Sequence, residues 1–177
     1  MRSSLRSDGK SKGLPIRKLT VLAMMGALMF ASQVVMAFVP NVHLVALLII
    51  VTGLLFGWEA FYSVILFVFL EGITYGFGLW WFSYLYVWPV LVLLVNLLRK
   101  NKSVFFWAVI AAVHGLCFGA LCSIPYFFMG GANMAFSYWI SGVPFDVVHC
   151  VSNFVLTLIL LKPLSTVIRR FALLKAD

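Results

Sequence analysis

Polar residues interrupt this chain at short intervals, and the apolar segments between them have the lengths of helices. Turn residues supply most of the interruptions, among them Val39-Pro40-Asn41, Gly57-Trp58-Glu59 and Gly76-Phe77-Gly78. Because a helix needs about 20 apolar residues to cross a bilayer, we interpret the segments as transmembrane helices. The predicted helices cover residues 18–38, 43–56, 60–75, 80–98, 104–125 and 144–161. The sequence thus predicts an all-α integral membrane protein with six transmembrane helices.

Two further segments, 129–142 and 163–174, lie outside these helices. The first opens with Gly130-Gly131 and predicts an outer loop. The second places its apolar residues on one helical face, which predicts an amphipathic helix on the cytoplasmic membrane surface. Four helices within residues 19–98 leave little room for loops, so some of them should be short, tilted or broken. Irregular backbone at membrane depth survives only where protein or a watery cavity covers it, so this compression favours a ligand cavity.

The positive charges predict how the chain is oriented. All 13 Lys and Arg residues lie in three clusters, at 2–18, 99–102 and 162–175. Cations are costly in hydrocarbon, and cytoplasmic flanks collect them. If all three clusters are cytoplasmic, residues 19–98 cross the membrane four times and residues 103–161 cross it twice. Both termini are then cytoplasmic. The expected organisation is a basic N-terminal segment (1–17), a transmembrane domain (18–161) and an amphipathic cytoplasmic tail (162–177).

Composition supports a multi-pass membrane protein and argues against several other classes. Hydrophobic residues make up 64% of the chain and charged residues 10%, so we interpret the net charge of +8 as an orientation signal rather than a nucleic-acid surface. The first apolar run is too long for a typical signal peptide and is expected to be retained. Three cysteines in apolar surroundings predict neither a disulfide framework nor a zinc site. No phosphate-binding glycine loop, His-Glu-x-x-His motif or nucleophile elbow is found, so we expect neither an enzyme nor a bound cofactor.

Polar and aromatic side chains concentrate in the predicted outer half of the membrane, where they define a candidate substrate site. The candidate residues are Glu71, Tyr75, Tyr84, Trp88, Trp139, Asp146, His149 and Asn153. Ionisable groups inside a membrane protein usually face the bundle interior and mark a functional path. Glu71 is the strongest candidate, because the outer half holds no basic residue to neutralise it.

Alternatives exist for the other candidates. Trp139 fits an aromatic belt at the membrane interface as well as a binding wall. Asp146 and His149 share a helical face with Asn153, and the first two would also fit a pair that ties helices together. His114 is interpreted as a hydrogen-bonded packing residue. Gln33, Asn41 and His43 are weaker site candidates.

The first predicted helix carries a strip of small residues. Ala23, Ala27 and Ala31 are spaced by four, with Gly26 beside them. Such a strip lets another helix approach closely, either a partner subunit or a helix of the same chain. By itself the strip does not distinguish the two.

With this strip and the segment Gly142-Val143-Pro144-Phe145-Asp146-Val147-Val148-His149-Cys150-Val151-Ser152-Asn153-Phe154, the chain resembles the substrate-binding S component of energy-coupling factor (ECF) vitamin transporters. The resemblance covers residues 18–165. It implies a six-helix protein of the bacterial cell membrane whose alanine strip contacts a transmembrane T component. It also implies two ABC-type ATPases as partners, and an S component that topples in the membrane to deliver its ligand.

The ligand expected for such a site is a neutral or cationic ring compound. Anionic substrates such as biotin, pantothenate or folate would find no Lys or Arg in the outer half. Rings stack on Trp and Tyr, and positive charge is attracted to their faces and to Glu71 or Asp146. Thiamine-, pyridoxine-, deazapurine- and corrinoid-like compounds remain open. The family's nickel and cobalt branch uses an extracellular N-terminal Met-His segment, which this basic, cytoplasmic N-terminus does not match.

Two other functions compete with transport. Glu71, His114, Asp146 and His149 would serve a small intramembrane enzyme if they converged around a metal such as zinc or iron. The chain would alternatively be a purely structural membrane subunit, which its buried acids make the least attractive interpretation.

Overall fold

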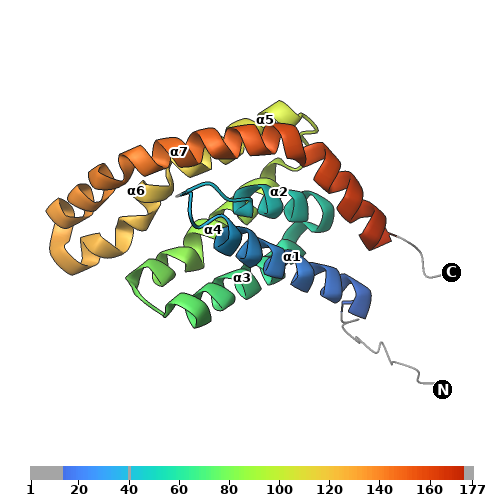
Figure 1. The fold of residues 1–177 in the computed structure, drawn as a ribbon, viewed down its shortest axis with the longest axis horizontal. Helices are drawn as coiled ribbons and strands as arrows, with labels where there is room; N and C mark the ends of the chain where they lie inside the picture. The colour runs from blue at the N-terminus through green and yellow to red at the C-terminus, as the bar shows by residue number, and fades with distance from the viewer. Residues whose placement is uncertain (1–13, 40, 174–177) are drawn as a thin grey trace, which may run out of the picture.

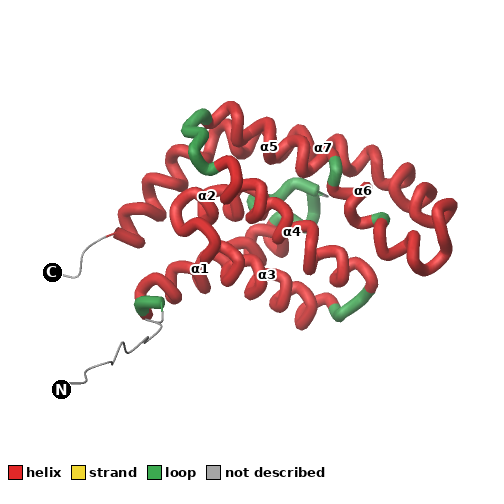
Figure 2. The backbone as a smooth tube through the Cα atoms, turned by 180° about the vertical axis from the view of Figure 1, so that it is seen from behind, coloured by secondary structure: helices red, strands yellow, loops and turns green. Residues whose placement is uncertain are grey.

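The computed structural model describes residues 14–39 and 41–173, and these residues form helices and short connections without any strand (Figures 1 and 2). The elements are α1 (Ile16–Val35), α2 (Val45–Phe56), the 3₁₀ helix η1 (Gly57–Glu59), α3 (Ala60–Tyr75), α4 (Leu79–Leu98), α5 (Val104–Leu116), α6 (Phe118–Cys122) and α7 (Ile124–Leu173). Four helical stretches are long and apolar enough to cross a membrane: Ile16–Val35, Val45–Tyr75, Leu79–Leu98 and Ile124–Phe171. The fold is therefore that of an all-α membrane protein.

The centre of the molecule is α2. Its residues from Val45 to Gly53 are all buried, on every side of the helix. A helix that is apolar all round is stable only when its neighbours cover it completely, and α1, α3, α4 and α7 surround α2. At Gly53 a Cβ would lie 2.6 Å from Cγ1 of Val95, so this glycine allows α2 and α4 to pack closely.

The first helix packs against α3 along one side only. Gly26 faces the backbone of Ser63, whose hydroxyl donates a hydrogen bond to the carbonyl of Leu22 (2.7 Å). The other side of α1 carries Ala23 and Ala27, which are exposed. The glycine beside the alanine strip thus serves packing within the chain, whereas the strip itself faces outward.

The ends of several helices meet at one end of the molecule. Arg17 donates a hydrogen bond to the carbonyl of Phe171 (2.8 Å), and Lys18 pairs with Glu59. These contacts join the start of α1, η1 and the last turn of α7, which lie at the same end in Figure 1. Arg99, in the connection from α4 to α5, lies close to the start of η1. A Cβ added to Gly57 would be 3.0 Å from Nη1 of Arg99. We call this end the basic end.

The predicted helix 60–75 is confirmed, and 80–98 differs from α4 by one residue at its start. The predicted outer loop 129–142 is wrong, because α7 is non-helical only at Gly130 and Gly131 and is helical from there to Leu173. Gly131 adopts a φ of 74°, which the absence of a Cβ makes inexpensive. The glycine pair makes a sharp kink, and the helix resumes directly after it.

Other boundaries differ as well: the first two helices are Ile16–Val35 and Val45–Phe56 rather than 18–38 and 43–56. The segment 104–125 divides into α5 and α6 at Cys117. Pro144 and Pro163 lie within α7 rather than at helix ends, so the tail predicted as a separate helix from 163 continues α7. Proline removes one backbone hydrogen bond and bends a helix without always ending it. The last part of α7 turns away from the rest of the helix in Figure 1.

Candidate ligand-binding site

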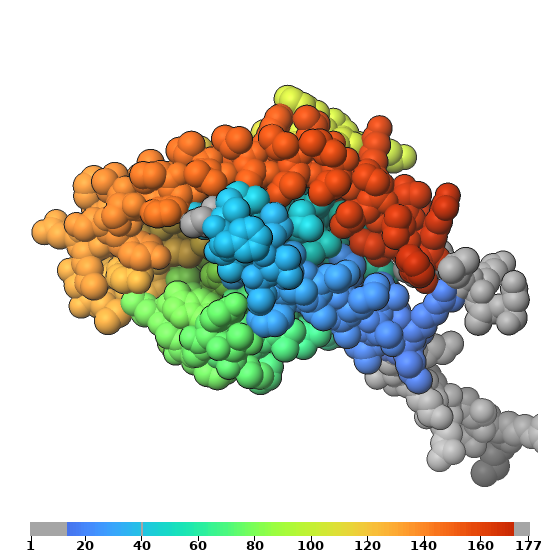
Figure 3. Space-filling view, viewed as in Figure 1, coloured from blue at the N-terminus to red at the C-terminus, as the bar shows by residue number. Residues whose placement is uncertain are grey.

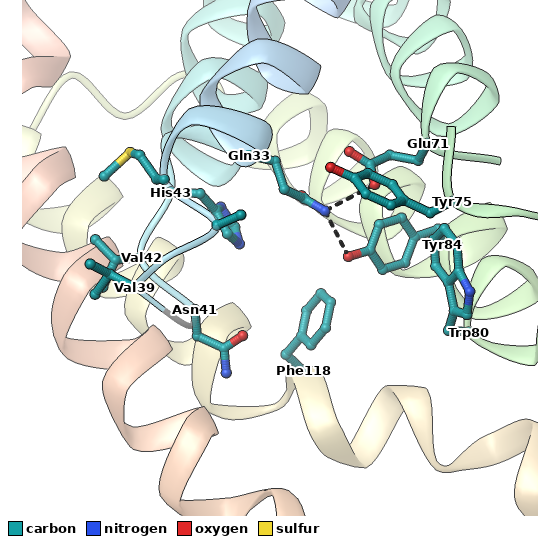
Figure 4. Close-up of a pocket in the computed structure, with 12 residues that line it drawn as sticks. Gln33, Val39, Asn41, Val42, His43, Glu71, Tyr75, Trp80, Tyr84 and Phe118 are labelled. Atoms are coloured by element: carbon teal, nitrogen blue, oxygen red, sulfur yellow. Dashed lines mark hydrogen bonds between the residues drawn. The ribbon is translucent and has the colours of Figure 1, made fainter. Parts of the chain in front are cut away.

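A pocket of about 350 Å³ opens at the end of the molecule opposite the basic end. It lies between the end of α1, the connection from α1 to α2, the end of α3, the start of α4 and α6 (Figure 4). The space-filling view is hollowed there, between the start of α4 and the first part of α7 (Figure 3). The lining residues are Gln33, Met36, Ala37, Val39, Asn41, Val42, His43, Glu71, Tyr75, Trp80, Tyr84 and Phe118. No Lys or Arg is among them.

Local backbone geometry brings these residues together. After α1 the chain turns back over the pocket, and Asn41 adopts a left-handed φ of 58°. The hydroxyl of Ser152 donates a hydrogen bond to the Asn41 carbonyl (2.9 Å), which holds this connection against α7. At the end of α3, Gly76 has a φ of 87° and reverses the chain toward α4. This reversal places Tyr75 and Trp80 on the same side of the pocket (Figure 4).

A hydrogen-bonded network forms the polar wall. The side-chain amide nitrogen of Gln33 donates to Oε2 of Glu71 (3.1 Å) and to the hydroxyl of Tyr84 (3.3 Å), as Figure 4 shows. Glu71 is only 1% exposed. Oε1 of Gln33 and Oε1 of Glu71 are both buried and accept no hydrogen bond from the described protein atoms. A buried acceptor without a donor costs about 1–3 kcal/mol, so this wall is suited to a ligand that brings donors.

Aromatic rings form the rest of the wall and a second layer behind it. Trp88 is fully buried, with its ring 5.6 Å from Tyr84, 5.8 Å from His43 and 5.3 Å from Phe118. The ring of His149 lies 4.9 Å from both His43 and Phe118. Trp88 and His149 therefore support the lining residues from behind. Four of these five ring contacts are edge-to-face, and such contacts hold rings in fixed orientations.

One titratable lining residue belongs to the connection rather than to a helix. Burial, and to a smaller extent the neighbouring His114, lowers the pKa of His43 to about 4. The ring is therefore neutral at pH 7. Because the lining also has no Lys or Arg, no cation of the pocket faces a ligand at neutral pH.

Asp146 and Asn153 tie helices together. The backbone N–H of Gly119 donates to Oδ1 of Asp146 (2.9 Å), and the Asn153 amide donates to the carbonyl of Ala111 (3.3 Å). These bonds fasten α7 to α6 and α5. Asp146 thus uses a backbone partner instead of His149, the partner that the sequence suggested. Oδ2 of Asp146 accepts no hydrogen bond from the described protein atoms.

The structure gathers some of the predicted site residues and separates others. Glu71, Tyr75 and Tyr84 line one pocket. Trp139 is 38% exposed, contacts Phe136 and is not part of the lining. The remaining predicted residues lie behind the lining or between helices: Trp88, Asp146, His149 and Asn153.

The first helix and the connection that follows it contribute more residues to the pocket than the sequence predicted. Gln33, Asn41 and His43 line the pocket, and Gln33 is the centre of its polar network. The available signal was an amide near the end of an apolar segment. Whether this amide faces a pocket depends on how the connection after α1 folds back, which the pattern of residues does not reveal.

His114 packs as predicted, with its Nε2 3.1 Å from the carbonyl oxygen of Val87. Across residues 14–39 and 41–173, no three His, Cys, Asp or Glu side chains are grouped so that they could hold one metal ion. Comparison with protein-family models, curated proteins and solved structures gives no significant match. The function of the pocket has to be inferred from its own residues.

Proposed function

We propose that the protein is the membrane-embedded substrate-binding subunit of an ECF-type importer, taking up a vitamin or a related small ring compound. The observation that carries the proposal is the pocket beside Glu71. It combines a carboxylate, an amide and several aromatic rings, and its lining has no Lys or Arg. Such a combination of apolar walls and few polar groups is typical of small-molecule sites. The resemblance of residues 18–165 to S components supports the same function.

The chemistry of the lining favours a neutral or cationic ligand. Glu71 attracts positive charge, and the unpaired oxygens of Glu71 and Gln33 suit ligand N–H or O–H donors. Tyr75, Trp80 and Phe118 offer faces and edges for a ring. A volume of about 350 Å³ suits a thiamine-, pyridoxine- or deazapurine-like compound better than a corrinoid.

The outward face of α1 supports a partner subunit. Ala23, Ala27 and Ala31 are all exposed, whereas Leu22 and Met25 on the other side of the helix are fully buried. Packing within the chain therefore leaves the alanine strip free. A T component would approach closely along such a strip, and two ABC-type ATPases would complete the importer.

The proposed topology has six spans with both termini in the cytoplasm of a bacterial cell. The chain turns at Gly57, where η1 begins, and the proposed topology counts α2 and α3 as two separate spans. The segment from α5 through α6 supplies another. With the basic end cytoplasmic, as the distribution of Lys and Arg favours, the pocket opens on the outer side.

A pair of Glu-to-Gln variants tests the function. Native mass spectrometry of gently purified protein first identifies the retained small molecule, and calorimetry then measures its affinity. Glu71→Gln should weaken binding about ten- to a hundredfold, because a charge-assisted hydrogen bond contributes about 1.5–3 kcal/mol. Glu59→Gln is the matched control, since Glu59 pairs with Lys18 at the basic end. Equal affinities of a folded Glu71→Gln variant and the parent would place the site elsewhere.

A further inference from the structure

A second and larger cavity lies at the basic end, where five cations converge. It measures about 1170 Å³ and lies between the end of α2, the connection from α4 to α5, and the last part of α7. Its cationic lining residues are Arg99, Lys102, Lys162, Arg169 and Arg170. We call this cavity the basic groove. We propose that the basic groove is a specific site for the phosphate headgroup of an anionic phospholipid.

Within residues 14–39 and 41–173, the cations of the groove have no carboxylate beside them in the lining. Among the described residues the ion pair found is Lys18–Glu59, which lies outside the lining. Five like charges around one cavity repel one another, and a bound phosphate would reduce that repulsion. An anion is therefore the ligand that the groove suits.

The cations come from two parts of the chain and face a common space. On α7, Lys162, Thr166 and Arg169 follow one another at spacings of four and three, so they share a helical face. Across the groove, Arg99 lies against the C-terminal end of α2 beside Gly57. Phosphate recognition from two sides fixes a headgroup in a way that a single charged helix face does not.

The apolar part of the lining favours a lipid over a soluble phosphate. Leu54, Leu55 and Leu161 line the same cavity as the cations, and so does Trp107. A headgroup phosphate would meet the Lys and Arg side chains while the glycerol and the first acyl carbons contact these residues. Free phosphate or a sugar phosphate would leave the apolar surface uncovered. The site is independent of the pocket beside Glu71, which lies at the other end of the molecule.

General attraction of anionic lipids to any cytoplasmic basic surface is the effect to be distinguished. The chain offers a matched pair for this purpose. Lys100 and Lys102 lie two residues apart in the connection from α4 to α5 and are both exposed, but only Lys102 lines the groove. A diffuse attraction responds equally to the loss of either charge. A specific site responds to one of them.

The experiment titrates the detergent-purified full-length protein with phosphatidylglycerol or phosphatidylcholine and counts bound lipids by native mass spectrometry. One phosphatidylglycerol should be retained in preference to phosphatidylcholine. Each cation near a lipid headgroup contributes about fivefold in affinity, so Lys102→Gln should weaken this site about fivefold and Lys162→Gln with Arg169→Gln about twenty-fivefold. Lys100→Gln should leave it unchanged.

Three results would overturn the proposal. Equal losses for Lys100→Gln and Lys102→Gln would indicate diffuse charge. Unchanged binding in the folded double variant would show that lipid binds elsewhere. Glycerol 3-phosphate that binds as tightly as phosphatidylglycerol in the same titration would assign the groove to a soluble phosphate. Circular dichroism and gel filtration establish that each variant is folded, and the exposed Lys102 provides a test even if the double variant is not.

Discussion

The two ends of this molecule treat charge in opposite ways. At the pocket end, Glu71 is almost fully buried, hydrogen-bonds to a neutral amide and has no cation in the surrounding lining. At the basic end, Lys18 pairs with Glu59 and Arg17 bonds to a backbone carbonyl, while the groove holds further cations. A polar group that the protein leaves partly unpaired is available to a partner from outside. The basic groove therefore suits an anion, whereas the pocket suits a neutral or cationic ligand.

The proposed topology places the two ends on opposite sides of the membrane. Cysteine labelling of the two ends tests this orientation and has the largest expected effect. Asn101 is exposed beside the basic end, and Asn133 is exposed just after the kink in α7. Single cysteines at these positions, in a background without Cys117, Cys122 and Cys150, should react oppositely. A membrane-impermeant thiol reagent should label residue 133 and not residue 101 in intact cells. External labelling of residue 101 would refute the proposed orientation.

The helix that runs between the two ends provides the second test. Ala27→Trp should abolish uptake of the ligand and leave its binding intact, because the bulky ring would keep a partner helix away from the exposed alanine strip. The measurements are transport by whole cells and binding by purified protein. Val113→Trp is the control, since Val113 is 52% exposed on α5. Loss of binding or folding in Ala27→Trp would instead indicate that the strip packs within the chain.

The smallest expected effect is a difference in the free energy of unfolding between tryptophan variants at the two ends. Trp88→Ala should lower the free energy of unfolding by about 3–5 kcal/mol, because it removes a fully buried ring behind the pocket wall. Trp58→Ala in η1 should change it by only about 0.5 kcal/mol or less, since Trp58 is 53% exposed. Denaturant titration in mixed micelles measures both. Similar losses would show that the rings behind the pocket wall are no more tightly packed than the surface of the basic end.

The sequence predicts helices well where glycine or charge ends an apolar segment. Glu59 and Gly76 bound α3 as expected, because Glu59 keeps its charge at the helix start, where it pairs with Lys18, and Gly76 adopts a positive φ that ends the helix. The prediction fails after Gly131, where the same type of signal marks a kink of two residues rather than a loop. Glycine indicates that the chain bends, but it does not indicate how soon the helix resumes.

The residues of the candidate site likewise divide into those that the sequence predicts and those that it does not. Glu71 and Tyr84 follow from the sequence, because a buried acid without a neighbouring cation is unusual anywhere in a membrane protein. Asp146 also satisfies that description, yet it accepts a hydrogen bond from the backbone of Gly119. Every residue has backbone groups, so the sequence cannot identify such a partner. Gln33 and His43 depend on the return of the chain after α1, which is a long-range property.

The hydrogen bond from Ser152 to the Asn41 carbonyl has a kinetic consequence. It fastens to α7 the one wall of the pocket that is not built from helix. Segments with few such restraints open by local unfolding far more often than packed helices do. If the pocket binds a ligand as proposed, the rate at which the ligand enters depends on the residues around Asn41, whereas Glu71 and Gln33 determine how long it is held once inside. Substitutions at the two places should change association and dissociation separately.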